Sequence, residues 1–532
     1  MPDCTYEVKL FSEASFYSLL SFPLVASGIL RPGEKYRSSR QEYLFRYLTN
    51  LGTKTIIAEH NYIDGDYLED FSSYYVRCHK TYASKCTRLH FFSLEINENK
   101  FLDLITRRLR QKDIDKILNS YNGFIVAKPL PNAQIGRTLL AAYPNNNYSA
   151  INNRQSCCTA IREYRPNLFG INLSVKSLPF QEQDNVLAAC ATVSLWSAFH
   201  KTADLFGSLA PRPAEITRAA NAAGGNSRAV PSQGLSIGQM ANAVRSVGLE
   251  PELIIAAPDL PLISVIYSYL KHGLPVILGV SMEGQEGLHA VTLVGFSTNE
   301  KQVIRSEVAS DEINATEIPK DKTKSTPSLI GLRIDNFYAH DDQIGPFSEL
   351  KVIDSDNDSV PVLFEGRWPG DNGNNQIMTP KWILVPIYNK IRVGFPCIQK
   401  CIMHFWTVLE SVLEKKYGEE THEWDVYLIK SVDLKNELTL ELRDDARLIP
   451  FLVMQQPRFV WRVSLKYGDK KMLEVLGDAT DIENACPFFE LIWFDSEIAP
   501  SVHEALNDGP IGEMPIVVFD FLKGTSNIAK CT

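Results

Sequence analysis

The sequence predicts an α+β protein built from three units. At 532 residues the chain is too long for a single hydrophobic core, and domains usually hold 100–200 residues. With 45% hydrophobic and 22% charged residues, the composition is typical of folded domains and excludes a disordered or fibrous chain. In the central third, helical patterns come first and β-type runs follow, an order that favours a helix packed on an antiparallel sheet.

The first unit, residues 1–175, is expected to be a mixed α+β domain. Helical spacing covers 32–52 and again 101–121, where Asn-Gly follows the second segment. Apolar β-type runs occupy 53–62 and 124–130. We find no pattern of a nucleophile and a base here, so the sequence leaves the role of this unit open.

The second unit, residues 176–390, carries the helices and then the strands. Its first helix is predicted to begin at Cys190 and to end near Leu205. The other predicted elements are helices at 211–225, 237–248 and 262–273, followed by strands at 275–281, 289–296, 329–340 and 381–388. Residues 298–328 are polar and charged and read as an inserted loop.

The third unit, residues 391–532, is expected to be a β-rich domain. A helix from about Cys397 to Lys415 opens it. Four β-type runs follow, at 424–432, 438–443, 458–467 and 490–496.

The net charge and the cysteine content restrict the partners and the cellular location that we expect. A net charge of −9 and a pI near 5.7 argue against a nucleic-acid partner. The apolar stretch 18–30 contains Pro23 and is too short to cross a membrane, and the first residues lack the basic start of a signal peptide. The ten cysteines show no framework spacing, so we expect reduced thiols and a cytoplasmic location.

Two groups of Cys and His residues resemble metal ligands but lack the usual spacing. A zinc site normally combines two short pairs of ligands, and neither group has a second pair. We therefore expect packing roles for both groups and no metal or organic cofactor. The groups are Cys78, His79, Cys86 and His90, and Cys397, Cys401 and His404.

Cys190 is the strongest candidate nucleophile. A polar, loop-like segment, 181–189, leads to an apolar stretch that begins at this cysteine. A helix N-terminus and a neighbouring imidazolium both stabilise a thiolate, the form of cysteine that attacks carbonyl groups. His289, at a junction between a loop and a predicted strand, is the candidate base.

An oxyanion site needs two hydrogen-bond donors. The backbone N–H of Cys190 can be the first, and a side-chain amide from the preceding loop can be the second. Gln183 lies seven residues before the cysteine and is our first choice, with Gln181 as the alternative.

A third group must orient the imidazole of His289. Asp341 follows the predicted strand 329–340 and is our first choice. Asp342 comes second and Asp335 third, and the sequence does not separate them.

This order of residues resembles the papain-like cysteine peptidase superfamily. Gln183, Cys190 at a helix start, His289 in HAVTLVGF and an acidic residue after a strand follow that pattern over about 176–390. The likeness is to its bacterial branch with a Cys-His-Asp triad, similar to peptidases that process bacteriocin leaders. It implies a papain-like central domain with Asp341 as the third member.

The resemblance implies a hydrolase that cleaves peptide or isopeptide bonds through an acyl-enzyme on Cys190, with a peptide or protein substrate. Two other functions fit the same residues: an acyltransferase or glutamine deamidase, and a catalytically inactive binding or scaffold protein. The sequence indicates neither the substrate nor the oligomeric state.

Overall fold

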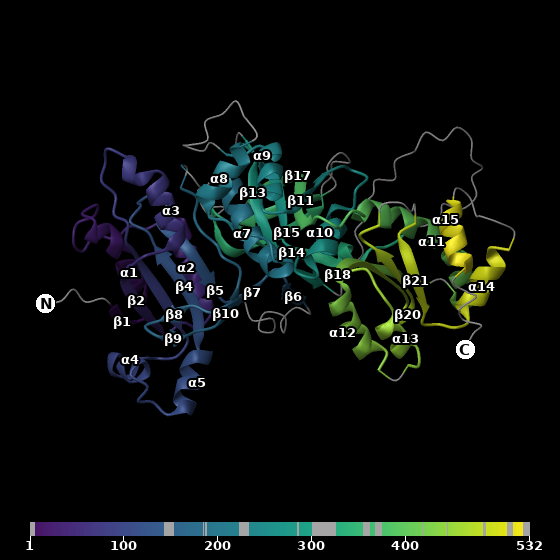
Figure 1. Cartoon of the computed structure of the whole chain (residues 1–532), viewed down its shortest axis with the longest axis horizontal. Coiled ribbons are helices and arrows are strands. Elements are labelled where there is room, and N and C mark those ends of the chain that lie inside the picture. The colour runs from purple at the N-terminus through teal and green to yellow at the C-terminus, as the bar shows by residue number, and fades with distance from the viewer. Residues whose placement is uncertain are drawn as a thin grey trace.

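The computed structural model has the expected α+β class, with three main antiparallel sheets that follow one another along the molecule (Figure 1). The structure describes residues 6–142, 154–184, 186, 189–222, 234–284, 287–299, 326–354, 362–367, 375–418, 420–443, 445–481, 486–507 and 514–524. The predicted insertion at 298–328 lies mostly outside the described residues. No helix in the described ranges is both long and apolar enough to cross a membrane.

The N-terminal sheet is a meander in which each strand pairs with the next. Its strands are β1 (Tyr6–Leu10), β2 (Thr55–Tyr62), β3 (Cys86–Phe92), β4 (Tyr121–Ala127) and β5 (Ile135–Leu140). Successive side chains alternate between its faces, so that Ile56 belongs to one apolar cluster and Ile57 to another. The helices of this unit are α1 (Glu13–Ala26), α2 (Ser39–Asn50), α3 (Gly65–Ser73), α4 (Glu98–Ile105) and α5 (Gln111–Asn119).

The single helix predicted over 101–121 is wrong. The segment forms the end of α4, a break and then α5. Arg107 adopts a left-handed conformation (φ 57°), and the next N–H bonds back to the carbonyl of Asp103 at 2.8 Å. This pairing is a Schellman-type helix end, which satisfies carbonyl groups that the helix leaves free. Gly123 lies within β4 instead of ending a helix.

The central sheet closes on itself. Six strands form a closed ring in the order β17, β12, β13, β14, β15, β16 and back to β17. Two further strands extend this sheet: β11 pairs with β17, and β6 pairs with β13. The strands are β6 (Arg154–Cys158), β11 (Leu249–Ile255), β12 (Val276–Met282), β13 (His289–Asn299), β14 (Ile334–Asp341), β15 (Gly345–Asp354), β16 (Val362–Arg367) and β17 (Asn375–Tyr388).

Helix α7 (Cys190–Phe206) packs against the central sheet and contacts β12, β13, β14 and β17. Trp196 and Phe199 on α7 share an apolar cluster with Ile277 and Trp382 of the sheet. Beside α7 lie α8 (Pro213–Asn221) and α9 (Ile237–Ser246), and α10 (Leu262–Leu270) contacts β12 and β13. Two short strand pairs belong to the segment 162–177: β7 (Arg162–Tyr164) pairs with β10 (Val175–Ser177), and β8 (Asn167–Leu168) pairs with β9 (Ile171–Asn172).

The C-terminal unit is α+β, not β-rich. Its sheet has the order β18 (His422–Lys430), β19 (Phe459–Tyr467), β20 (Lys470–Asp478) and β21 (Phe488–Trp493). The described residues add five helices: α11 (Phe395–Tyr417), α12 (Ser431–Glu441), α13 (Leu448–Val453), α14 (Ile498–Ala505) and α15 (Ile516–Gly524).

The run 438–443, predicted as a strand, lies mainly in α12. Its leucines alternate, but Leu434, Leu438 and Leu442 also recur every four residues and are buried together against the sheet. Leu440, which a strand would place on the same face, is 72% exposed. The helical period therefore describes the buried face, and the alternation was misleading.

A buried ion network joins α12 to the C-terminal sheet. Arg462 on β19 is 2% exposed, and its guanidinium donates to both carboxylate oxygens of Glu474 at 2.9 and 2.8 Å. It also reaches Glu437 and Glu441 of α12 at 2.5 and 2.8 Å. Glu474 is fully buried and pairs with Arg462 and also with Lys471, whose Nζ lies 2.6 Å from its carboxylate.

We predict that Arg462→Ala lowers the free energy of unfolding by about 3 kcal/mol, because it removes the guanidinium that binds both oxygens of buried Glu474 and leaves Lys471 as its charged partner. Urea denaturation with tryptophan fluorescence measures the loss. Arg110→Ala is the matched control, since the Arg110 side chain is 89% exposed beside Asp113 and surface pairs contribute about 0–1 kcal/mol. Equal losses in the two variants would contradict the prediction.

Candidate active site

Cys190 is the first residue of α7. Ala189 precedes it in an extended conformation, and no side chain caps this helix end. The thiol is half-buried and lies at the N-terminal end of this helix.

Two hydrogen bonds hold α7 against β13 one helical turn beyond the cysteine. The hydroxyl of Ser194 donates to the carbonyl of Ala290 at 2.8 Å, and the hydroxyl of Thr292 donates to the carbonyl of Ser194 at 2.9 Å. Ala290 follows His289 directly, so this junction fixes the imidazole beside the start of α7. The thiol of Cys190 lies in hydrogen-bonding contact with His289.

The other side of the imidazole meets a carboxylate. Nε2 of His289 lies 3.1 Å from Oδ1 of Asp341, the last residue of β14. The same oxygen accepts the backbone N–H of Gln343 at 2.9 Å, which holds the carboxylate in place. Since Nε2 is taken by Asp341, Nδ1 is the nitrogen left to face the sulfur.

Charge balance in this enclosed site favours the imidazolium. Burial by itself opposes a charged ring, and His289 is only 3% exposed. The Asp341 carboxylate and its hydrogen bond, together with Cys190 and Asp342, outweigh burial and hold the pKa of His289 well above its usual value. A positively charged ring beside the sulfur is the arrangement that stabilises a thiolate.

Asp342 is a second buried carboxyl group at the site. Its Oδ1 lies 3.7 Å from Nε2 of His289, and neither oxygen has a hydrogen-bond partner among the described residues. Burial, reinforced by the charge of Asp341, raises the pKa of Asp342 to about 7, against the opposing effects of His289 and Arg40. The carboxyl group of Asp342 is therefore partly protonated near neutral pH.

Asp335, the third candidate for the orienting acid, lies elsewhere. Its Oδ1 accepts the hydroxyl of Ser297 at 2.7 Å, six residues before Asp341 on β14. The structure thus brings Asp341 and Asp342 to the imidazole and gives Asp335 a different neighbour.

The two candidate glutamines differ in burial. Gln181 is 2% exposed, and its amide nitrogen has no hydrogen-bond partner within the described ranges. Gln183 is half-buried. Pro179, just before them, accepts hydrogen bonds from Ser197 of α7 at 2.5 Å and from His340 of β14 at 3.3 Å. The glutamine segment therefore runs alongside the elements that carry Cys190 and Asp341.

The N-terminal unit holds this glutamine segment, a role that the sequence did not reveal. Arg40 on α2 forms an ion pair with Glu182 at 2.6 Å and donates to the backbone carbonyl of Asp342 at 3.3 Å. Tyr75 donates to Asp184 at 3.1 Å. One arginine thus joins the glutamine segment to the acid pair, and no local motif around Arg40 could have indicated this.

Comparison with known proteins gives no assignment. The sequence matches no protein-family model, and no curated protein sequence is significantly similar to it. The function must therefore be argued from the site itself.

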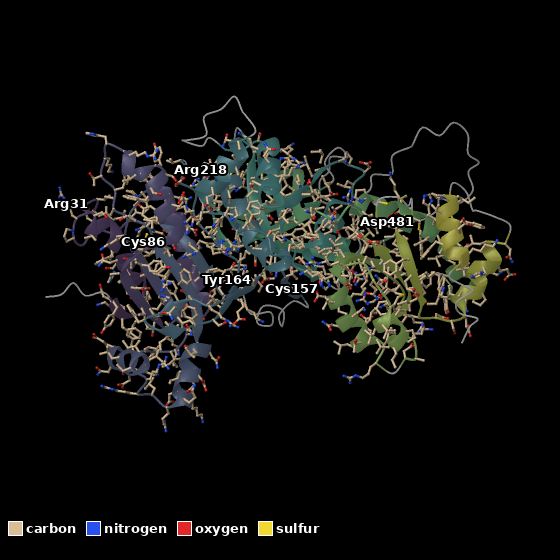
Figure 2. All side chains as sticks on the ribbon, in the orientation of Figure 1. Arg31, Cys86, Cys157, Tyr164, Arg218 and Asp481 are labelled. Carbon is tan, nitrogen blue, oxygen red and sulfur yellow. The ribbon has the colours of Figure 1, made fainter. Side chains whose placement is uncertain are left out.

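His289, Asp341 and Asp342 could also hold a metal ion. One ligand atom from each lies within 4.8 Å of the others, and all three residues are buried. Within the described ranges, no such cluster includes the cysteines and histidines of either group that the sequence offered. His90 instead contacts the hydroxyl of Tyr121 at 2.9 Å. Cys86 lies in the N-terminal unit, away from the candidate active site (Figure 2).

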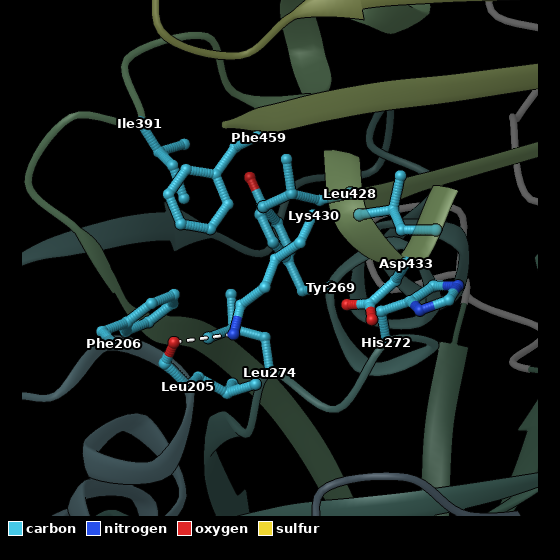
Figure 3. A pocket seen from close by; sticks show the side chains of 11 residues that line it. Leu205, Phe206, Tyr269, His272, Leu274, Ile391, Leu428, Lys430, Asp433 and Phe459 are labelled. Carbon is cyan, nitrogen blue, oxygen red and sulfur yellow. Dashed lines mark hydrogen bonds between the residues drawn. The ribbon is translucent and has the colours of Figure 1, made fainter. Parts of the chain in front are cut away.

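A pocket at the boundary with the C-terminal unit is separate from this site. It lies between the end of α7 and β18, where Lys430 donates to the carbonyl of Leu205 at 2.7 Å (Figure 3). Leu205 is fifteen residues from Cys190 on one helix, which at 1.5 Å per residue is a distance of about 22 Å. We therefore assign this pocket no part in the chemistry at Cys190.

We predict that Asp342→Asn changes the pH dependence of stability. A carboxyl group whose pKa is raised on folding stabilises the fold fully below its unfolded value near 4, and loses that contribution as pH rises to about 7. The free energy of unfolding of the variant should therefore rise relative to the native protein between pH 4 and 8.

Urea denaturation at several pH values measures this difference. Asp115→Asn, on the exposed side of α5, controls for the loss of one negative charge. A difference between Asp342→Asn and the native protein that stays constant with pH would contradict the raised pKa.

Proposed function

We propose that this chain is a thiol hydrolase with a papain-like central domain, which cleaves peptide or isopeptide bonds through an acyl-enzyme on Cys190. The observation that supports this most is the position of His289, which contacts both the thiol of Cys190 and the carboxylate of Asp341. These three residues come from the start of a helix, the start of one strand and the end of another.

In the proposed reaction, the Cys190 thiolate attacks the carbonyl carbon of the substrate. The His289 imidazolium then gives its proton to the leaving amine, which departs and leaves a thioester on the sulfur. The neutral imidazole next takes a proton from water, which attacks the thioester and releases the acid. Asp341 keeps the ring oriented and stabilises its positive charge through both steps.

The oxyanion of each tetrahedral intermediate needs donors near the sulfur. The backbone N–H of Cys190, at the free start of α7, supplies one. Gln181 is the better-supported side-chain donor, because its buried amide has no other hydrogen-bond partner among the described residues. An unsatisfied buried donor costs about 1–3 kcal/mol. A buried Gln181 amide without a partner therefore fits a donor whose hydrogen bond forms only when substrate binds.

The arrangement of helix and sheet supports a papain-like central domain. A helix that begins with the cysteine packs on an antiparallel sheet that carries the histidine and the acid. A peptide or protein substrate in the cytoplasm, with no metal, organic cofactor, nucleic acid or membrane, completes the proposal.

Two other functions use the same three residues. An acyltransferase or glutamine deamidase would form the same thioester, so ammonia release or amide exchange without peptide cleavage would favour it. A catalytically inactive scaffold would keep the fold without a reactive thiol.

We predict that iodoacetamide at neutral pH labels Cys190 faster than half-buried Cys78, and that His289→Ala lowers the rate at Cys190 about tenfold or more. An ordinary cysteine, with a pKa near 8.5, is only a few per cent thiolate at pH 7 and reacts slowly. An imidazolium beside the sulfur increases the thiolate fraction and therefore the labelling rate. Mass spectrometry of labelled peptides gives the rate at each cysteine. Labelling of Cys190 no faster than that of half-buried Cys78 would favour the scaffold.

The same experiment with a chelator distinguishes thiol chemistry from a metal site at His289, Asp341 and Asp342. Labelling and turnover of a fluorogenic peptide library that survive dialysis against EDTA support the thiol mechanism. Turnover that is lost with EDTA and restored by a divalent cation would overturn it.

We predict that Gln181→Ala lowers kcat by about 10²–10³, the usual cost of an oxyanion donor. Gln183→Ala is the matched control from the same segment and should retain most of the activity. Circular dichroism of both variants checks the fold. The opposite pattern would assign the donor to Gln183, as the sequence first suggested.

A further inference from the structure

Three cysteines gather in the C-terminal unit. Cys397 and Cys401 lie one turn apart on α11, and Cys486 comes two residues before β21. Cys401 is 3% exposed, and the other two are half-buried. Cys486 is absent from the sequence pattern of Cys397, Cys401 and His404, because 85 residues separate it from Cys401.

Packing holds the α11 cysteines against the segment that leads into β21. The thiol of Cys401 lies in hydrogen-bonding contact with both Cys397 and Cys486. One turn further along α11, the ring of Phe405 lies 5.2 Å from the ring of Phe488. The carbonyl of Pro487 also accepts the N–H of Asp478 at 2.8 Å, which fixes this segment to the end of β20.

Helix geometry decides which two sulfurs can bond. Residues four apart on a helix have Cβ atoms about 5–6 Å apart, whereas a disulfide needs about 3.5–4.5 Å. Cys397 and Cys401 therefore cannot bridge without distorting α11. Cys401 and Cys486 belong to different segments and carry no such restriction.

We propose that Cys401 and Cys486 form a reversible disulfide under attack by a hydroperoxide, joining α11 to the segment before β21. The inference does not depend on the proposed activity at Cys190. It assigns a modification site to a part of the chain that the candidate active site does not use.

The reaction balances with hydrogen peroxide as the oxidant. The Cys486 thiolate attacks one peroxide oxygen, the O–O bond breaks, and a sulfenic acid and water result after proton transfer. The sulfur of Cys401 then attacks the sulfenic sulfur, the S–O bond breaks, and the departing hydroxide takes the thiol proton as water. Two thiols and one peroxide give one disulfide and two waters, and the thiols lose two electrons.

The electrostatics of the cluster support Cys486 as the first thiol to react. When the single proton of the Cys401 thiol is donated to Cys486, this hydrogen bond lowers the pKa of Cys486 against the opposing effect of burial. When it is donated to Cys397 instead, that hydrogen bond lowers the pKa of Cys397 to about 7. Cys397 is thus a second thiolate of similar exposure, which makes it an internal control for geometry.

The disulfide would act on the junction between units. Helix α11 begins just after β17, and the N–H of Phe395 at its start bonds to the hydroxyl of Tyr269 on α10 at 3.4 Å. A covalent bond from Cys401 to the β20–β21 connection would therefore tie the N-terminal third of this helix to the C-terminal sheet, close to the point where its start contacts the central unit.

The test uses the full chain carrying Cys190→Ser, so that oxidation of the proposed nucleophile does not interfere. The reduced protein is treated with hydrogen peroxide, quenched with N-ethylmaleimide and mapped by mass spectrometry. We expect a linked peptide containing Cys401 and Cys486, two fewer free thiols, and a higher melting temperature that dithiothreitol reverses.

Variants separate this bond from its alternatives. Cys486→Ser should lower the linked peptide more than tenfold, and Cys397→Ser should leave it unchanged. Cys486→Ser changes a half-buried position and avoids the packing loss expected at Cys401. A linked Cys397–Cys401 peptide, or irreversible oxidation of Cys486 with no linked peptide, would overturn the proposal.

Discussion

The pairing of α7 with β13 is the constraint on which the site depends. Ser194 donates a hydrogen bond to Ala290 and accepts one from Thr292, so one turn of the helix is tied to two residues of the strand. Cys190 lies one turn before this junction, and His289 lies one residue before it. The sulfur and the imidazole therefore meet because the backbone of the core sets their distance.

Burial strengthens the electrostatic interactions among the groups of this site. Imidazole, thiol and two carboxyl groups share a space that excludes most water, where charges interact strongly and unpaired charges are costly. Asp341 lies in contact with the imidazole ring, and burial raises the pKa of Asp342 to about 7. The pKa of His289, held well above its usual value, places a positive charge beside the sulfur of Cys190.

The flanking units contribute to the site and to its surroundings in different ways. The N-terminal unit supplies Arg40, which pairs with Glu182 and holds the backbone of Asp342, so the active-site loops rest on a second sheet. The C-terminal unit packs on α10 through Asp425 of β18, which accepts from Tyr267 at 2.9 Å and from Lys271 at 2.6 Å. A single apolar cluster that includes residues of all three sheets makes these contacts part of one core.

Periodicity and turn chemistry were enough to predict the α+β class, most elements of the central unit, and the placement of Cys190 and His289 at element starts. Such patterns are local, because hydrophobic spacing and helix ends depend on neighbours within a few residues. They failed where two periods overlapped, as in the leucines of α12, and where a helix end depended on one left-handed residue, Arg107.

Other features needed the tertiary structure. Local patterns left Asp341, Asp342 and Asp335 equivalent, and only strand register brought the first two to the imidazole. Burial of the Gln181 amide, the reach of Arg40 and the contact of Cys486 with Cys401 likewise join residues distant along the chain. The sequence by itself determined which groups have the right chemistry and local setting. Which of them touch was decided by the packing of helices on sheets, because contacts between distant residues depend on the register and orientation of whole elements.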